Sequence, residues 1–210
     1  MRLTPPPPTT PPHPHLHRSH TEPTVFASCS ADGTVKVWDV RDKSKRAQLS
    51  AKAHDADVNV ISWNPKTAYL LASGSDDGSF KVWDFRAFGD RTVNGSVKRQ
   101  PPVAHFKYHR APIYALTWCP TDESMLAVAG ADDLLTLWDL SVEEDEDEAA
   151  KRAAAAAASG MADAGEIPPQ LMFVHQGQNN LKEARFHPQM PGVVLSSAYD
   201  GFNVFKAEIF

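Results

Sequence analysis

The chain has 210 residues, and its hydrophobic (42%) and charged (22%) fractions favour a folded soluble domain over a fibrous or unstructured chain. The net charge is −5, and one run of six acidic residues contributes six negative charges. The rest of the chain is therefore close to neutral, which argues against a broad basic surface for binding nucleic acid. No apolar run approaches the ~18 residues that span a bilayer. Cys29 and Cys119 are too few for a disulfide framework or zinc site, and we expect buried thiols in a reducing, intracellular compartment.

Residues 1–24 form a leader rich in proline and histidine. The leader holds eight of the 17 prolines and four of the nine histidines, His13, His15, His17 and His20. Because proline fixes φ and removes a backbone donor, we expect this leader to be disordered or extended and unable to join a sheet. Metal binding is an alternative role for the histidines, but no spacing fixes their geometry, and no metal ligand is predicted.

From residue 25 onward the sequence contains an internal repeat. Residues 25–39, 70–84, 125–139 and 193–205 each consist of two short β-rich runs joined by an Asp-Gly turn, or by Asp-Asp in the third copy. Such turns tolerate positive φ, and flanks that alternate apolar and polar residues are typical of β-hairpins. The repeat therefore predicts four hairpins in series.

A further strand precedes three of these hairpins. Residues 58–65, 113–120 and 181–188 each carry an aromatic residue two positions before a proline, which ends the strand. The first two hairpins end on Trp38 and Trp83, and this spacing of about 45 residues is the period of a four-stranded propeller blade. The later, longer intervals require insertions.

The predicted fold is all-β: a partial β-propeller of about three and a half to four four-stranded blades, from a ring of about seven. The repeats are expected to occupy residues 25–210, with a partial unit at 25–39, full units at 54–84, 109–139 and 175–205, and a loop insertion at 141–168. Nothing before residue 25 is expected to supply the strand that closes the ring. We therefore expect the C-terminal half of a longer propeller, which alone exposes two unpaired blade faces and self-associates.

The hairpins and their Trp-Asp endings resemble the WD40 family over residues 25–210. The resemblance implies a buried relay of His, Ser or Thr, Asp and Trp within each blade. Matching positions are Ser28, Asp32 and Trp38 in the first unit, His54, Ser73, Asp77 and Trp83 in the second, and His109, Asp132 and Trp138 in the third. Val128 replaces the hydroxyl residue of the third unit, so that relay is expected to be incomplete. The relay is not carried over to the fourth unit, where His175 is displaced and Phe205 replaces Trp.

The His and Asp pairs are predicted to be structural rather than catalytic, because they recur once per repeat. A buried Asp can accept hydrogen bonds from the N–H groups of His and Trp. The sequence shows no phosphate-binding glycine loop, nucleophile motif or metal-ligand spacing. We therefore predict no enzyme activity, no catalytic residue and no cofactor.

Several stretches are not generic repeat sequence. Residues 53–63, 169–177, 181–183 and 187–192 resemble the glutamate-rich WD-repeat family, which is related to histone-binding WD-repeat chaperones. The resemblance implies a nuclear or nucleolar chaperone in large-subunit ribosome biogenesis. Its implied partners are a basic ribosomal protein (protein three of the large subunit) and histones, with no membrane and no sequence-specific nucleic acid.

An acidic run opens the insertion that follows the third hairpin. Its members are Glu143, Glu144, Asp145, Glu146, Asp147 and Glu148, and six alanines at residues 153–158 follow. Adjacent like charges repel, so we expect a mobile polyanion that attracts basic chains and is the candidate binding segment for a basic client. A solubilising loop without a partner is the alternative.

Two hairpins end in a Trp-Asp-x-Arg box, which contains Asp39 and Arg41 in the first case and Asp84 and Arg86 in the second. These boxes resemble those of substrate receptors that dock on the adaptor of cullin-4 ubiquitin ligases, and the arginines would offer bidentate donors. A local ion pair between each arginine and its aspartate is the alternative. Ser141 breaks the pattern in the third copy.

Overall fold

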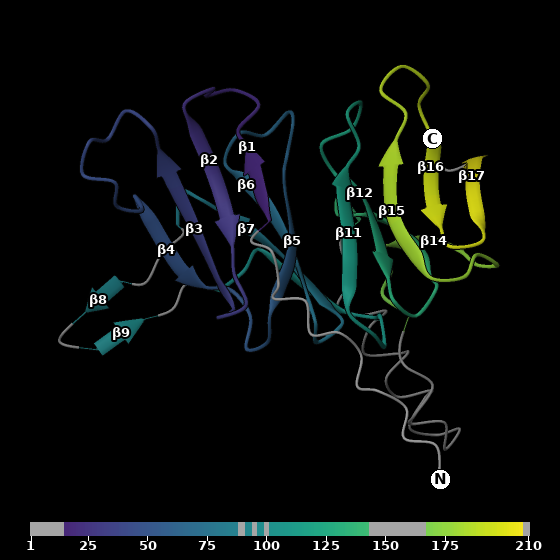
Figure 1. Ribbon diagram of the computed structural model, residues 1–210, viewed down its shortest axis with the longest axis horizontal. Helices are drawn as coiled ribbons and strands as arrows, with labels where there is room; N and C mark the ends of the chain where they lie inside the picture. Colours follow the sequence, from purple (N-terminus) through teal and green to yellow (C-terminus); the bar gives the residue numbers. More distant parts are fainter. Residues whose placement is uncertain (1–14, 88–90, 94–95, 99–100, 143–166, 208–210) are drawn as a thin grey trace, which may run out of the picture.

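The computed structural model describes residues 15–87, 91–93, 96–98, 101–142 and 167–207, and their regular elements are all β-strands (Figure 1). The strands are β1 (Leu16–Arg18), β2 (Val25–Cys29), β3 (Thr34–Asp39), β4 (Leu49–Lys52), β5 (Val58–Trp63), β6 (Leu70–Ser75), β7 (Ser79–Asp84), β8 (Arg91–Val93), β9 (Ser96–Lys98), β10 (Ala104–Lys107), β11 (Ile113–Trp118), β12 (Met125–Gly130), β13 (Leu135–Asp139), β14 (Leu171–His175), β15 (Leu181–Phe186), β16 (Val193–Ala198) and β17 (Gly201–Lys206). A search of these residues finds no helix with the length and apolarity needed to cross a membrane.

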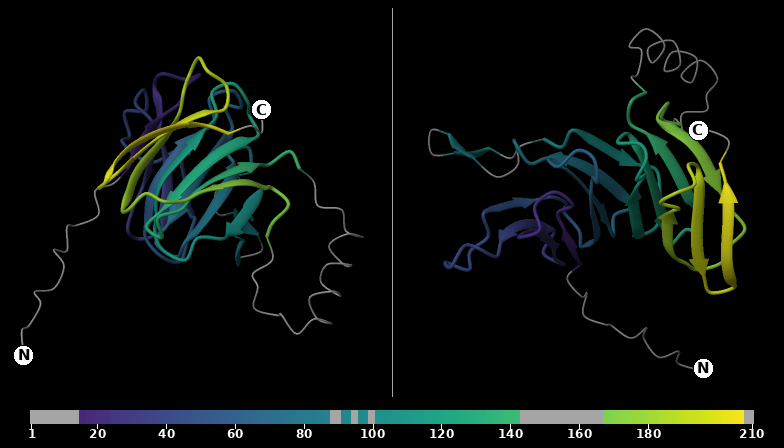
Figure 2. Two further views of the ribbon diagram at one scale, coloured as in Figure 1. Left: turned by 90° about the vertical axis from the view of Figure 1, so that its right-hand side faces the viewer. Right: turned by 90° about the horizontal axis from the view of Figure 1, so that it is seen from above.

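The strands form a series of antiparallel sheets. Three sheets have four strands, in the orders β1-β2-β3-β4, β5-β6-β7-β10 and β11-β12-β13-β14; a fourth has the order β15-β16-β17, and β8 pairs with β9. The first strands of neighbouring sheets contact one another, β1 with β5, β5 with β11 and β11 with β15. Figures 1 and 2 show the four sheets side by side in chain order, which is the predicted partial propeller.

Each predicted hairpin forms at the expected position. In the first two, the turn glycines Gly33 and Gly78 have positive φ, and a Cβ on either would collide with the backbone carbonyl of His54 or His109 in the next sheet. Asp133 takes the equivalent place in the third hairpin with a φ of 61°, which Asp tolerates better than most residues. The turns are thus shaped both by local conformation and by the approach of the neighbouring sheet.

The apolar core lies between the sheets rather than within one of them. Ile61 and Leu71 pack with the first sheet, Phe80 and Trp138 meet between the second and third, and Leu137 packs against the fourth. All six residues of β12 are buried, because its sheet has a neighbour on both faces. On β17 of the fourth sheet, by contrast, Phe202 is 63% exposed. Self-association through such a face stays a prediction.

The predicted boundary of the leader is wrong. Leu16–Arg18 form β1, which pairs with residues 26–28 of β2 and begins the first sheet. The prolines that motivated the prediction stop at Pro14 and return only at Pro23, so the segment between them can donate to a ladder. Residues 1–14 lie outside the described part of the chain.

Two leader histidines lie against the inner edge of the second sheet. His15 Nδ1 accepts a hydrogen bond from the backbone N–H of Ile61, and His17 Nδ1 accepts one from Trp63, both at 3.4 Å. Burial lowers the pKa of both rings, that of His17 to about 4, and nearby positive groups, including Arg185, lower them further. The neutral rings therefore act as acceptors for edge amides that no strand pairs. Among the described residues, no group of three or more His, Cys, Asp or Glu side chains is placed to hold a metal ion.

The lowered histidine pKa values predict an acid-sensitive fold. Unfolded histidines take up protons below about pH 6.5, whereas folded His17 stays neutral to about pH 4, so the unfolded state binds more protons across this window. Stability should be full above pH 6.5 and should fall as the pH drops towards 4. His17→Gln keeps an acceptor but does not titrate, so its melting temperature should depend less on pH over this range. An unchanged pH dependence would show that His17 makes no such contribution.

Candidate functional site

The second sheet contains a continuous hydrogen-bonded relay that is buried except at Asp77, whose side chain is 33% exposed and not buried as expected. Trp83 Nε1 donates to Ser73 Oγ at 2.9 Å, and Ser73 Oγ lies 2.8 Å from His54 Nε2. His54 Nδ1 lies 3.2 Å from Ser79 Oγ, which donates to Asp77 Oδ1 at 2.6 Å. Asp77 Oδ2 is 3.9 Å from His54, so Ser79, which the sequence analysis did not include, joins the two. The indole N–H goes to a hydroxyl and not to the aspartate, contrary to the sequence-based expectation.

The chemistry of the two ends fixes the direction of this relay. An indole can only donate and a carboxylate can only accept. Burial, reinforced by Lys81, lowers the pKa of His54 to about 4, so the ring is neutral near pH 7. Ser73 therefore donates to Nε2, and Nδ1–H donates to Ser79, whose own proton goes to Asp77. Each hydrogen is used once, and the relay has no proton left for a substrate.

The third sheet has a complete relay, in which Thr136 is the member that the sequence analysis missed. His109 Nδ1 lies 2.9 Å from Asp132 Oδ1, its Nε2 lies 3.0 Å from Thr136 Oγ1, and Trp138 Nε1 donates to Thr136 at 2.8 Å. The expected gap at Val128 is filled because Thr136 pairs with Val128 across the ladder. Paired residues of an antiparallel ladder share a face, so the hydroxyl moves to the neighbouring strand without leaving the relay.

The first and fourth sheets contain shorter hydrogen-bonded relays. In the first, Trp38 Nε1 donates to Ser28 Oγ at 2.8 Å, while Asp32 accepts from the hydroxyl and N–H of Thr34 in the turn. In the fourth, buried Ser196 donates to the amide oxygen of Gln178. Gln178 lies three positions before β15, whereas His54 lies four positions before β5. A comparison of the repeats at fixed spacing therefore does not find Gln178.

The two Trp-Asp-x-Arg boxes have matching geometry. Arg41 donates to both carboxylate oxygens of Asp39, and Arg86 does the same to Asp84, with closest N–O distances of 2.7 and 2.6 Å. These bonds are the main reason that the pKa of Asp39 falls to about 2. Arg86 also lies over the ring of Tyr69 at 3.7 Å. Both arginines are about two-thirds exposed. The local ion pair thus forms in both boxes and leaves each guanidinium accessible.

Residues 143–148, the predicted acidic site, lie outside the described residues.

Comparison with known proteins agrees with this repeated geometry. The family model for the WD domain, G-beta repeat, matches residues 15–39, 46–84 and 100–139. The chain contains WD40 repeats. The first match begins at residue 15, in accord with β1. At the level of fold, a chain from the crystal structure of a mitotic checkpoint complex superposes with a TM-score of 0.64 at 17% identity, covering 91% of this chain and 47% of that one.

Three curated relatives are similar in sequence. The ribosome assembly protein rrb1 of Schizosaccharomyces pombe is 48% identical over 93% of this chain, and glutamate-rich WD repeat-containing protein 1 of Dictyostelium discoideum is 49% identical over 90%. The histone-binding protein MSI1 of Saccharomyces cerevisiae is 34% identical over 59% of the chain. The chain spans 38%, 36% and 27% of the lengths of these relatives.

The role of the Thr136 hydroxyl in the relay of the third sheet can be tested by substitution. Thr136→Val should destabilise the chain by about 1–3 kcal/mol, because the buried indole of Trp138 loses its acceptor. The exchange Val128→Thr with Thr136→Val returns the hydroxyl to the strand used in the second sheet, with the same atoms in the core. It should recover most of the loss in urea unfolding. A single variant as stable as the parent would rule out this role for Thr136.

Proposed function

We propose that this chain is part of a non-enzymatic WD-repeat scaffold that works as a chaperone in assembly of the large ribosomal subunit, in the nucleus and nucleolus. The observation that carries the proposal is the similarity to a ribosome assembly protein over 93% of the chain, well beyond the segments that the generic repeat model matches. A basic ribosomal protein is the proposed client. The similarity to a histone-binding protein supports histones as a second class of client.

The relay geometry supports a role without chemistry. His54 is 1% exposed and His109 is 3% exposed, so neither imidazole can reach a substrate. Each is already bonded through both ring nitrogens to groups of its own sheet. A general acid or base needs a free, reachable nitrogen near the reacting atom. These pairs are better explained as supports that keep the blades rigid.

The acidic run at residues 143–148 is the proposed contact for basic clients. It supplies six of the 26 acidic residues within one short stretch. Such a concentration of negative charge attracts a basic chain at long range and competes with nucleic acid for it. The attraction is electrostatic, so it should weaken as salt shortens the screening length to about 8 Å at physiological ionic strength.

Replacing the six acids with Ser and Gln should therefore weaken binding of a purified basic large-subunit protein by about tenfold at low salt, and by less at high salt. Fluorescence anisotropy of the labelled client measures this directly. The matched control replaces Ala153–Ala158 with Ser and Gln, which alters the same insertion without removing charge. Equal affinity of the parent and the charge-free variant would reject the acidic run as the contact.

A second candidate function is docking on the adaptor of a cullin-4 ubiquitin ligase. Its support is that two neighbouring sheets present guanidiniums in the same bidentate pose while leaving them about two-thirds exposed. Binding to the purified adaptor should be lost in the Arg41→Ala/Arg86→Ala variant. It should persist in Arg185→Ala, which removes an arginine of similar exposure that is paired with Glu183. Adaptor binding that survives the double substitution would dismiss this function.

A further inference from the structure

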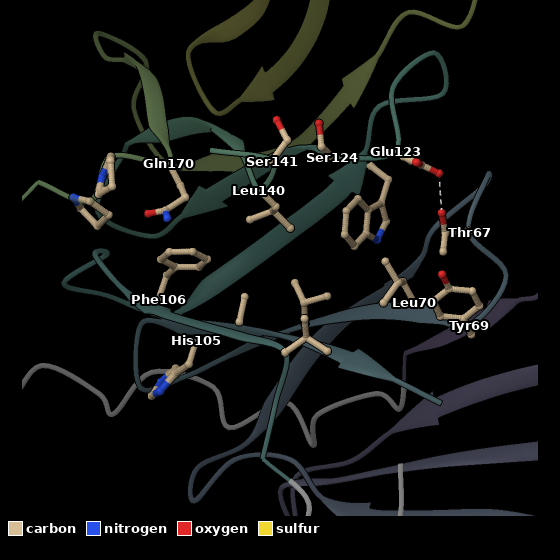
Figure 3. Close-up of a pocket in the computed structure, with 16 residues that line it drawn as sticks. Thr67, Tyr69, Leu70, His105, Phe106, Glu123, Ser124, Leu140, Ser141 and Gln170 are labelled. Carbon is tan, nitrogen blue, oxygen red and sulfur yellow. Dashed lines mark hydrogen bonds between the residues drawn. The ribbon is translucent and has the colours of Figure 1, made fainter. Parts of the chain in front are cut away.

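A cavity of about 690 Å³ lies between the second and third sheets, in the size range typical of ligand sites (Figure 3). One wall comes from the β7 and β10 side, with Phe106 and His105, and the other from the loops around β13 and β14, with Leu140 and Gln170. Both sheets have four strands among the described residues. The cavity is therefore formed by two neighbouring blades and does not depend on how the ring closes.

The middle of the cavity is apolar. Phe106 and Leu140 face each other across it, and Leu70 lies farther along the same space (Figure 3). Trp118 adds an aromatic surface, and Val103, which is 64% exposed, lies where the cavity meets solvent. This lining suits one bulky aliphatic or aromatic side chain, since burying such a group contributes about 1.5–3 kcal/mol.

The serine, threonine and glutamine oxygens of the lining act as acceptors, while the Tyr69 hydroxyl and the His105 ring each carry a donor as well. Thr67 already donates its hydroxyl hydrogen to Glu123, at 2.7 Å. The hydroxyls of Ser124 and Ser141 likewise donate to the carboxylates of Asp122 and Asp139. A hydroxyl that has given away its hydrogen can only accept a further bond. The amide of Gln170 donates to the carbonyl of Val142, which leaves its own oxygen as an acceptor.

The charge of the lining also favours a ligand with N–H donors. Glu123 is the acidic residue of the lining, and no Lys or Arg is among the residues that line the cavity. Burial, helped by Lys81, lowers the pKa of His105, so that ring is neutral near pH 7. A ligand that brings N–H donors and a positive charge therefore complements most of this lining, and an anionic ligand is disfavoured.

We propose that this cavity binds a linear peptide segment that inserts one Phe or Leu side chain between Phe106 and Leu140 and places an adjacent Lys or Arg against Glu123. Peptide N–H groups supply the donors that the serine, threonine and glutamine oxygens lack. The inference rests on the cavity itself, and it holds whether or not the partner is ribosomal.

The test uses the full chain and a fluorescein-labelled nonapeptide of Gly and Ser with Phe-Lys at its centre. Two matched peptides carry Ser in place of Phe, or Gln in place of Lys. Val103→Arg, which adds bulk and positive charge at the entrance, should weaken binding of the Phe-Lys peptide by at least about tenfold. Val40→Arg is its control, because Val40 is also exposed, at 67%, but lies in the turn after β3 of the first sheet. Thermal melts check that both variants fold.

Glu123→Gln tests the charge pairing. Affinity for the Phe-Lys peptide should fall roughly two- to fivefold, as expected for an exposed ion pair, whereas affinity for the peptide with Gln should not change. Glu183→Gln, remote from the cavity, removes the same charge as a control. Equal binding of the peptides with Phe and Ser would overturn the proposal, because it would indicate simple attraction to the acidic run. So would a Val103→Arg variant that binds like the parent, or a lack of saturable binding.

Discussion

The structure depends on satisfying the indole N–H at the end of each Trp-Asp hairpin. This group is buried by the neighbouring sheet, and a buried donor without an acceptor costs about 1–3 kcal/mol. In the first three sheets a hydroxyl accepts it: Ser28, Ser73 or Thr136. In the second and third sheets that hydroxyl contacts a histidine from the loop before the first strand, which links the inner and outer parts of the blade. Among the described residues, no buried side-chain nitrogen or oxygen lacks a partner.

The same need for acceptors joins one sheet to the next. Trp118 of the third sheet donates its indole N–H to the carbonyl of Ser62 in the second, and Asn64 donates to the carbonyl of Glu123 in the opposite direction. At the other side of the second sheet, His15 and His17 accept from the amides of Ile61 and Trp63. Apolar packing brings the sheets together without direction, and these bonds fix their register. A rigid stack with few adjustable internal parts follows from this combination.

The fold could be predicted from the sequence wherever a residue pattern repeats. The four hairpins and the strands before them follow from Asp-Gly turns and from aromatic residues at fixed spacing, since these determine local conformation and the buried face. The strands β1, β4 and β10 were not predicted. Each has three or four residues, largely half-buried or exposed, and is positioned by pairing with a hairpin rather than by its own sequence.

The relays show where position-by-position comparison fails. Ser73 and Trp83 could be assigned because the second unit follows the repeat, and the structure brings them together. Thr136 was missed because the comparison tested one position of the strand, whereas the physical requirement is a hydroxyl anywhere on that face within reach of the indole. Val128 and Thr136 occupy one cross-strand pair, as Ser73 and Lys81 do in the second sheet. The pair, and not the single residue, is the unit that must supply the hydroxyl.

Specificity for a binding partner must then come from polar groups that are not part of the relays. The relay hydrogens are used within the blades. Around the cavity between the second and third sheets, the hydroxyl hydrogens of Thr67, Ser124 and Ser141 are likewise donated to nearby carboxylates. What remains around that cavity is mainly a set of oxygen acceptors and the carboxylate of Glu123. A segment that carries N–H donors and positive charge complements such a lining, whereas an acidic segment would leave its oxygens unpaired. The segment proposed to enter the cavity is therefore expected to be basic rather than acidic.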